Sequence, residues 1–202
     1  MKFIAMGAVA VTVVFIGVIG WMTLGGNTSD QFAQCRSSTV AGDLGGPFEL
    51  VNGAGETVTD ADVITEPTLI YFGYTFCPDV CPLDVDRNAH AVELLEEQGK
   101  IVTPVFITVD PARDTPEVVR EFAEVMHPRM IGLTGSDEEI AALAKAWRVY
   151  FAKAGDDPED YLMDHSTFTY LVAPGGEFLE VFRRESTPEQ IADAVQCFSE
   201  AM

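Results

Sequence analysis

Basic residues are scarce in this chain. Its 202 residues include 12 Lys and Arg against 32 Asp and Glu, which gives a formal net charge of −20. Nucleic-acid binding requires a basic face that releases counterions, so this balance argues against a nucleic-acid partner. It also argues against a peripheral protein held to anionic lipid by charge. A hydrophobic content of 48% is too high for a disordered chain.

Charged residues are absent between Phe3 and Leu24. A helix of this length extends over about 33 Å, which matches the hydrocarbon thickness of a bilayer. A cleaved signal peptide is the alternative, but its apolar region usually spans about 7–15 residues and ends in a small-x-small site. No obvious Ala-x-Ala follows here, and Trp21 suits the outer interface. The sequence therefore predicts an uncleaved membrane anchor over residues 1–26.

The charges that flank this segment predict its orientation. Lys2 precedes it, and the first acidic residue, Asp30, follows it. The positive-inside bias places the N-terminus in the cytoplasm and the remainder outside. We therefore expect a single-pass protein of the bacterial inner (cytoplasmic) membrane, with its soluble domain in the periplasm, where disulfides persist.

The remainder of the chain is predicted to form a tether over residues 27–46 and one domain over residues 47–202. The tether is rich in Gly, Ser, Thr and Asn. Apolar β-branched and aromatic runs predict strands, at 48–51, 68–74, 102–109, 167–172 and 178–182. Cap residues and apolar periodicity predict helices, at 79–98, 115–126, from Ser136 and from Thr187. This order indicates a mixed sheet covered by helices on both faces, the thioredoxin-like α/β arrangement.

Cysteine is rare, with four residues, too few for a disulfide scaffold. Cys77 and Cys81 follow the predicted strand 68–74, at the sheet edge where α/β proteins place their sites. Pro78 suits a first helical position, so both sulfurs can share one face of the first turn, where the helix dipole favours thiolate. The Cys-x-x-x-Cys spacing permits a disulfide but also suits two sulfurs that flank a metal. A plain stabilising disulfide is the alternative.

A third metal ligand would come from one of three histidines. His90 lies within a predicted helix among polar residues, and we expect it on the solvated surface. His127 lies between Met126 and Met130, a set that could bind soft copper, but the adjacent Pro128 favours a structural turn.

His165 lies at the mouth of the predicted strand 167–172. Two thiolates and one imidazole form a soft, low-coordinate set that suits copper(I) and can still hold copper(II), whereas zinc would accept the same trio with an added water. Asp164 could orient the site from outside it. A histidine with a purely structural role is the alternative.

The chain resembles the SCO/SenC family (also called PrrC) of membrane-anchored, thioredoxin-fold copper chaperones for cytochrome c oxidase assembly. Four segments carry the resemblance, in the family's order: Phe72-Gly73-Tyr74-Thr75-Phe76-Cys77-Pro78-Asp79-Val80-Cys81-Pro82, Thr108-Val109-Asp110-Pro111-Ala112-Arg113-Asp114-Thr115-Pro116, His127-Pro128-Arg129-Met130-Ile131-Gly132-Leu133-Thr134-Gly135 and Tyr161-Leu162-Met163-Asp164-His165-Ser166.

The resemblance implies that Cys77, Cys81 and His165 are copper ligands, with one copper per chain. It also implies delivery of copper to the binuclear copper centre of cytochrome c oxidase subunit II, or maintenance of that centre's cysteines in the reduced state. A copper donor chaperone would load the site.

Four further residues have open roles. Asp110 and Asp114 are typical of an Asx-type turn and a helix cap, while a role for Asp110 in shaping the metal loop or a partner surface is the alternative. In an oxidising compartment Cys35 and Cys197 could pair and fasten the tether to the last helix. Two free thiols, or additional soft-metal ligands, are the alternatives.

Three functions therefore compete. A copper-binding and transfer protein needs all three ligands, whereas a thiol–disulfide oxidoreductase needs Cys77 and Cys81 without His165. A thiol peroxidase is the third candidate, since this fold also hosts peroxidatic cysteines. The first two functions can coexist, because a disulfide cannot bind copper until it is reduced.

Overall fold

The structure is a computed structural model that describes residues 31–38, 44–155, 157 and 160–202. The chain divides into two compact units, Met1–Gln34 and Cys35–Met202. Residues 31–34, the described part of the first unit, form a turn, and all that follows concerns the second. The predicted anchor over 1–26 lies outside the described residues. Within the described ranges, every helix is too short or too polar to cross a bilayer. The expected boundaries at residues 26 and 46 remain predictions.

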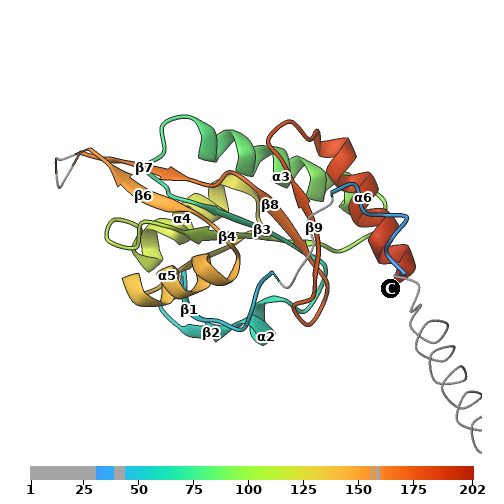
Figure 1. The fold of residues 1–202 in the computed structure, drawn as a ribbon, viewed down its shortest axis with the longest axis horizontal. Coiled ribbons are helices and arrows are strands. Elements are labelled where there is room, and N and C mark those ends of the chain that lie inside the picture. Colours follow the sequence, from blue (N-terminus) through green and yellow to red (C-terminus); the bar gives the residue numbers. More distant parts are fainter. Residues whose placement is uncertain (1–30, 39–43, 156, 158–159) are drawn as a thin grey trace, which may run out of the picture. The chain divides into compact units, whose positions relative to one another are not determined.

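A mixed sheet forms the centre of the second unit (Figure 1). In spatial order its described strands are β2 (Thr57–Thr59), β1 (Glu49–Asn52), β5 (Ile131–Thr134), β4 (Thr103–Thr108), β3 (Thr68–Gly73), β8 (Thr169–Val172) and β9 (Phe178–Phe182). The strands β3, β4 and β5 run parallel, and the remaining pairs run antiparallel. All six residues of β3 and of β4 are buried, as their continuous apolar runs predict.

Helices cover both faces of this sheet. They are α2 (Asp60–Val63), α3 (Val80–Glu97), α4 (Pro116–Met126), α5 (Asp137–Ala146) and α6 (Pro188–Ala201). Side chains alternate along β3, so Tyr71 meets Asp84 of α3 on one face, while Phe72 meets Trp147 at the end of α5 on the other. Helix α3 also packs against α4 and α6. The core therefore has two layers, one on each side of β3 and β4.

The predicted helix starts are confirmed at three caps. The side chains of Thr115, Ser136 and Thr187 accept hydrogen bonds from backbone N–H groups of the first turn of α4, α5 and α6. Helix α3 differs, because it begins at Val80 with Asp79 as its N-cap. Pro78 therefore precedes the helix and does not occupy its first position.

Several short elements were not predicted: β2, α2, β5 and a separate two-stranded ribbon of β6 (Phe151–Ala154) and β7 (Leu162–His165). In β5, Gly132 weakens the strand signal, yet it is required there because a Cβ would lie 2.4 Å from the Val119 carbonyl oxygen. The ribbon changes the expected setting of His165. This residue ends β7 opposite Phe151, and three residues separate it from the start of β8.

The beginning of the second unit is fastened to its C-terminal elements. Cys35 and Cys197 form a disulfide, with 5.6 Å between their Cα atoms, so these two cysteines pair as expected. The buried Glu180 of β9 accepts hydrogen bonds from the backbone N–H groups of Ser37 (2.6 Å) and Ser38 (3.1 Å). Leu44 packs into the main core.

Candidate metal centre

The site begins where β3 ends. The strand stops at Gly73, where an added Cβ would lie 2.9 Å from Tyr71 Cε1 and 3.2 Å from Cys81 Sγ. Only hydrogen fits at this position, so the backbone lies directly against the buried sulfur. The loop that follows contains Cys77 and leads into α3, whose first turn contains Cys81.

Asp114 holds this loop from the neighbouring segment. Its carboxylate accepts hydrogen bonds from Thr75 N–H (2.9 Å), Thr75 Oγ1 (2.5 Å) and Thr108 Oγ1 (2.6 Å). Burial raises the pKa of Asp114, while the two threonines oppose the rise. Thr115 alone caps α4, as its position before Pro116 predicts, and Asp114 takes no part in the cap. Asp114 thus joins the loop before Cys77 to the end of β4, a role that the sequence did not predict.

Cys77 and Cys81 are free thiols in different surroundings. Burial alone would raise the pKa of Cys77, but the backbone N–H groups of Cys81 and Asp79 outweigh it, so this pKa lies below its usual value. The N–H of Cys81 donates to Cys77 Sγ at 3.3 Å. Burial raises the pKa of the Cys81 thiol well above the ordinary range. Cys77 is therefore the more acidic thiol of the pair, and Cys81 is the less acidic one.

The His165 ring meets the buried sulfur. Its Nε2 lies 3.2 Å from Cys81 Sγ, and its Nδ1 lies 2.9 Å from the carbonyl oxygen of Ser166. Because a carbonyl oxygen can only accept, Nδ1 carries the proton and the Nε2 lone pair faces the sulfur. Burial lowers the pKa of His165, which favours this neutral form.

Two aromatic rings fix the plane of the imidazole. The rings of Tyr71 and Tyr74 meet it edge-on, with centroids at 6.2 Å and 5.8 Å. Asp164 is exposed, and alternation along β7 places it on the opposite side of the ribbon from His165. The Ser166 carbonyl, rather than Asp164, therefore orients the ring.

A buried polar network that was not predicted lies beneath Cys81. The hydroxyl of Tyr71 donates to Asp84 at 3.0 Å, and Arg184 Nε donates to the other oxygen of this carboxylate at 3.3 Å. Asp84 lies about one helical turn after Cys81, between Leu83 and Val85. This acidic residue between two apolar ones is the only feature of the sequence that indicates the network.

Asp110 fixes the aromatic surroundings of Cys77. Its buried carboxylate accepts from Tyr161 Oη (2.7 Å) and Arg113 Nε (2.5 Å). The guanidinium of Arg113 then lies 3.7 Å from the centroid of the Tyr161 ring and 4.9 Å from that of Phe76. Asp110 therefore positions Arg113 near the ring of Phe76, the residue before Cys77, in addition to closing the turn whose backbone bonds reach its carbonyl oxygen.

The other two histidines stay outside the site, as expected. His90 is exposed on α3. His127 is buried in a turn, where its Nδ1 accepts from Arg129 N–H at 3.1 Å.

The three predicted ligands come together in pairs. Among the described residues, no group of three or more His, Cys, Asp or Glu side chains already has a metal-binding arrangement. Cys77 interacts with Cys81, and Cys81 contacts His165. The 3.2 Å between Cys81 Sγ and His165 Nε2 is close to the roughly 3.1–3.6 Å expected for a sulfur and an imidazole nitrogen on one ion. Two sulfurs and one imidazole nitrogen are donors of the kind that soft metals prefer, so the residues present fit such an ion.

Comparison with known proteins gives consistent matches. A protein-family model described as SCO1/SenC matches residues 36–200. Protein SenC of Rhodobacter capsulatus is 51% identical over 203 residues, which cover 100% of this chain and 92% of that protein.

Two solved structures are also similar. The structure of Arabidopsis thaliana ScoI with copper bound has a TM-score of 0.74 and 40% identity, and covers 78% of this chain and 99% of that chain. The structure of BsSco has a TM-score of 0.62 and 25% identity, and covers 80% of this chain and 98% of that chain. BsSco is described as a member of the Sco family of cytochrome c oxidase assembly proteins in which a disulfide switch is identified. These similarities confirm the predicted thioredoxin-like α/β domain.

Proposed function

Because the chain belongs to the SCO1/SenC family, we propose that it binds one copper ion through Cys77, Cys81 and His165 and transfers it during cytochrome c oxidase assembly. The acceptor is the binuclear copper centre of oxidase subunit II, and a copper donor chaperone loads the site. The predicted anchor over 1–26 holds the domain at the periplasmic face of the inner membrane.

One observation carries this proposal: the Nε2 lone pair of His165 faces Cys81 Sγ at 3.2 Å. A disulfide oxidoreductase does not require an imidazole at this position. The copper-bound state of Arabidopsis ScoI, a relative at 40% identity, supports copper as the ion.

The two thiols have separate parts in metal capture and release. Cys77 is half-buried and has the lowered pKa, so it offers a thiolate to an arriving copper(I) ion. Cys81 loses its proton only when the ion replaces it, because its burial otherwise disfavours the anion. Three ligands leave one side of the ion open, where an acceptor sulfur or nitrogen can bind before the donor releases.

The same asymmetry favours a second candidate function, reduction of a partner disulfide. The Cys77 thiolate attacks the partner's S–S bond, forms a mixed disulfide and releases one partner thiolate, which takes up a proton. Cys81 then loses its proton and attacks Cys77, which forms the Cys77–Cys81 disulfide and releases the second partner thiol. Two electrons pass to the partner. The disulfide switch described for BsSco supports coupling between this redox state and the metal.

Copper titration of the reduced full-length chain tests the proposal. We expect one copper per chain and, with copper(II), thiolate charge-transfer bands. His165→Ala should weaken binding at least about tenfold, since it removes one of three donors. His90→Ala, which removes an exposed histidine, is the matched control and should bind normally. If the His165→Ala protein bound copper with unchanged affinity and still reduced a disulfide substrate, the result would contradict copper transfer and favour the reductase function.

A further inference from the structure

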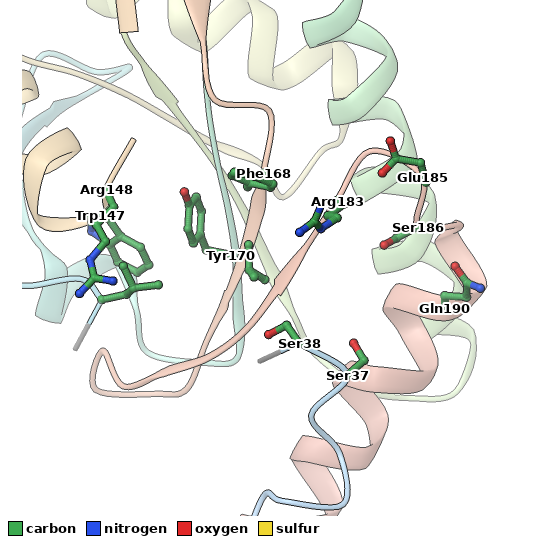
Figure 2. A pocket seen from close by; sticks show the side chains of 12 residues that line it. Ser37, Ser38, Trp147, Arg148, Phe168, Tyr170, Arg183, Glu185, Ser186 and Gln190 are labelled. Carbon is green, nitrogen blue, oxygen red and sulfur yellow. The ribbon is translucent and has the colours of Figure 1, made fainter. Parts of the chain in front are cut away.

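A cavity between the strands β8 and β9 and the segment that carries Ser37 and Ser38 is lined by neither Cys77 nor Cys81 (Figure 2). It is a cavity of about 540 Å³, within the range of pockets that hold small molecules. Its apolar wall consists of Trp147, Phe168 and Tyr170. None of the three predicted copper ligands lines it, and nothing in the copper or thiol chemistry above uses it.

The polar lining of the cavity is cationic in a strongly acidic protein. Arg148 and Arg183 both line it, and within the described part of the chain neither guanidinium forms an ion pair. Carboxylates pair instead with Arg87, Arg113, Arg120, Arg129 and Arg184. Both side chains are solvent-exposed, and two guanidinium groups without a carboxylate partner at the rim of one apolar cavity are complementary to an organic anion.

The backbone at Arg148 gives an independent indication. Arg148 has φ of 53° in the left-handed region, and in the described residues it is the sole non-glycine residue with positive φ. It terminates α5 through hydrogen bonds from Arg148 N–H to Lys145 O and from Val149 N–H to Ala144 O, a motif that normally has glycine at this position. The chain therefore keeps a strained arginine where glycine would be relaxed, and this arginine lines the cavity.

Trp147 adds an unused donor. The residue is 1% exposed, and its indole N–H has no hydrogen-bond partner among the described residues. The nitrogen itself is buried, so Trp147 contributes an unsatisfied donor beside the cavity together with its apolar ring. Ser37, Ser38 and Ser186 contribute hydroxyl groups to the same lining.

The arrangement of the charges limits the shape of the ligand. Arg148 and Arg183 lie on either side of the Tyr170 ring in Figure 2, and Glu185 lies at the far end from Trp147. We propose that this cavity binds an amphipathic organic anion whose flat apolar body packs on the aromatic wall and whose acidic groups meet the two arginines. Glu185 disfavours a ligand that extends its negative charge to that end.

Calorimetric titration of the full-length chain in detergent, against a blank of the same micelles, tests the proposal. The probe is naphthalene-2,6-dicarboxylate, and its uncharged diamide is the matched control ligand. We expect saturable binding of one dicarboxylate per chain, at least tenfold tighter than the diamide. Absence of binding, or equal affinity for the two compounds, would overturn the proposal.

Variants separate a ligand site from a merely structural role. Arg148→Gln and Arg183→Gln should each weaken dicarboxylate binding about tenfold, whereas Lys145→Gln removes a positive charge of α5 outside the cavity and should change binding less than twofold. Arg148→Gly should weaken binding equally while its thermal midpoint stays equal to or above that of the parent chain, because glycine relaxes the backbone. The site would be refuted if Arg148→Gln, Arg183→Gln or Arg148→Gly bound the dicarboxylate with the affinity of the parent chain.

A double variant keeps this site distinct from the copper function. The Cys77→Ser/Cys81→Ser chain should bind the dicarboxylate with parental affinity although it loses copper binding. Loss of dicarboxylate binding in this chain would contradict a cavity independent of the metal centre.

Discussion

Asp114 binds Thr75 through both carboxylate oxygens, at 2.9 Å to the backbone N–H and 2.5 Å to the hydroxyl. These two residues lie on segments that follow different strands, β3 and β4. The loop that presents Cys77 is therefore held by the neighbouring strand as well as by its own.

Asp114→Asn should destabilise the fold and loosen this loop. The amide retains one acceptor and points N–H groups at donors, so one or two buried hydrogen bonds are lost and the free energy of unfolding falls by about 1–3 kcal/mol. Urea denaturation measures the change, and copper titration should show weaker binding. Asp137→Asn, an exposed site at the start of α5, is the control. A change below about 0.5 kcal/mol would mean that the contact with Thr75 does not hold the loop.

The two thiols should react at very different rates. Because its pKa is lowered, a larger fraction of Cys77 than of an ordinary cysteine is thiolate at a given pH. In the folded, reduced chain, iodoacetamide should modify Cys77 before Cys81. As the pH is lowered, the modification rate of Cys77 should fall at a lower pH than the rate of the same cysteine in the denatured chain. Cys81, buried and with a raised pKa, should stay unmodified. Mass spectrometry of peptides from samples treated across pH 5–9 measures the modification rates of both cysteines. Faster modification of Cys81 than of Cys77 would contradict the prediction that Cys77 is the more acidic thiol.

Gly73→Ala should disturb the contact between β3 and the buried sulfur. The new Cβ would meet Tyr71 Cε1 at 2.9 Å, Phe106 Cε2 at 3.0 Å and Cys81 Sγ at 3.2 Å. Overpacking of this kind costs about 1–3 kcal/mol. Gly46→Ala is a matched control, since its Cβ would have one neighbour, at 3.8 Å. Equal urea midpoints for the two variants would show that the sulfur and rings move aside at little cost.

Loss of the disulfide should lower stability without affecting the metal site. Cys35 and Cys197 are separated by 162 residues, and closing so long a loop contributes up to about 5 kcal/mol in the chain-entropy model. We expect Cys35→Ser/Cys197→Ser to lose about 2–5 kcal/mol of unfolding free energy. Copper affinity of the folded variant should be unchanged, because neither cysteine contacts Cys77, Cys81 or His165. A loss below 1 kcal/mol would indicate that other contacts, such as those of Glu180, already fasten the segment.

Local signals predicted much of the fold. Thr115, Ser136 and Thr187 identify helix starts because capping depends on residues within one turn. The buried strands β3 and β4 were predicted because continuous apolar runs of six residues are distinctive. The ribbon of β6 and β7 was missed because it is short and half-exposed and contains Lys153 and Asp164.

The site was predictable only in part. Cys77, Cys81 and His165 were selected by residue chemistry and by resemblance, and the structure brings them into pairwise contact. The contacts of Asp114 and Asp84 were not predicted, because they depend on partners 39 and 13 residues away that only the tertiary fold brings near. An isolated aspartate in a sequence gives no indication of which hydroxyl it will meet.

The disulfide between Cys35 and Cys197 has a mechanical consequence. Any pull on the chain from before Cys35 passes at once, through a covalent bond, into the last helix. The intervening sequence is thereby bypassed, so tension applied before Cys35 need not be carried through β3. The loop that contains Cys77 can therefore keep its geometry while such a force acts on the chain.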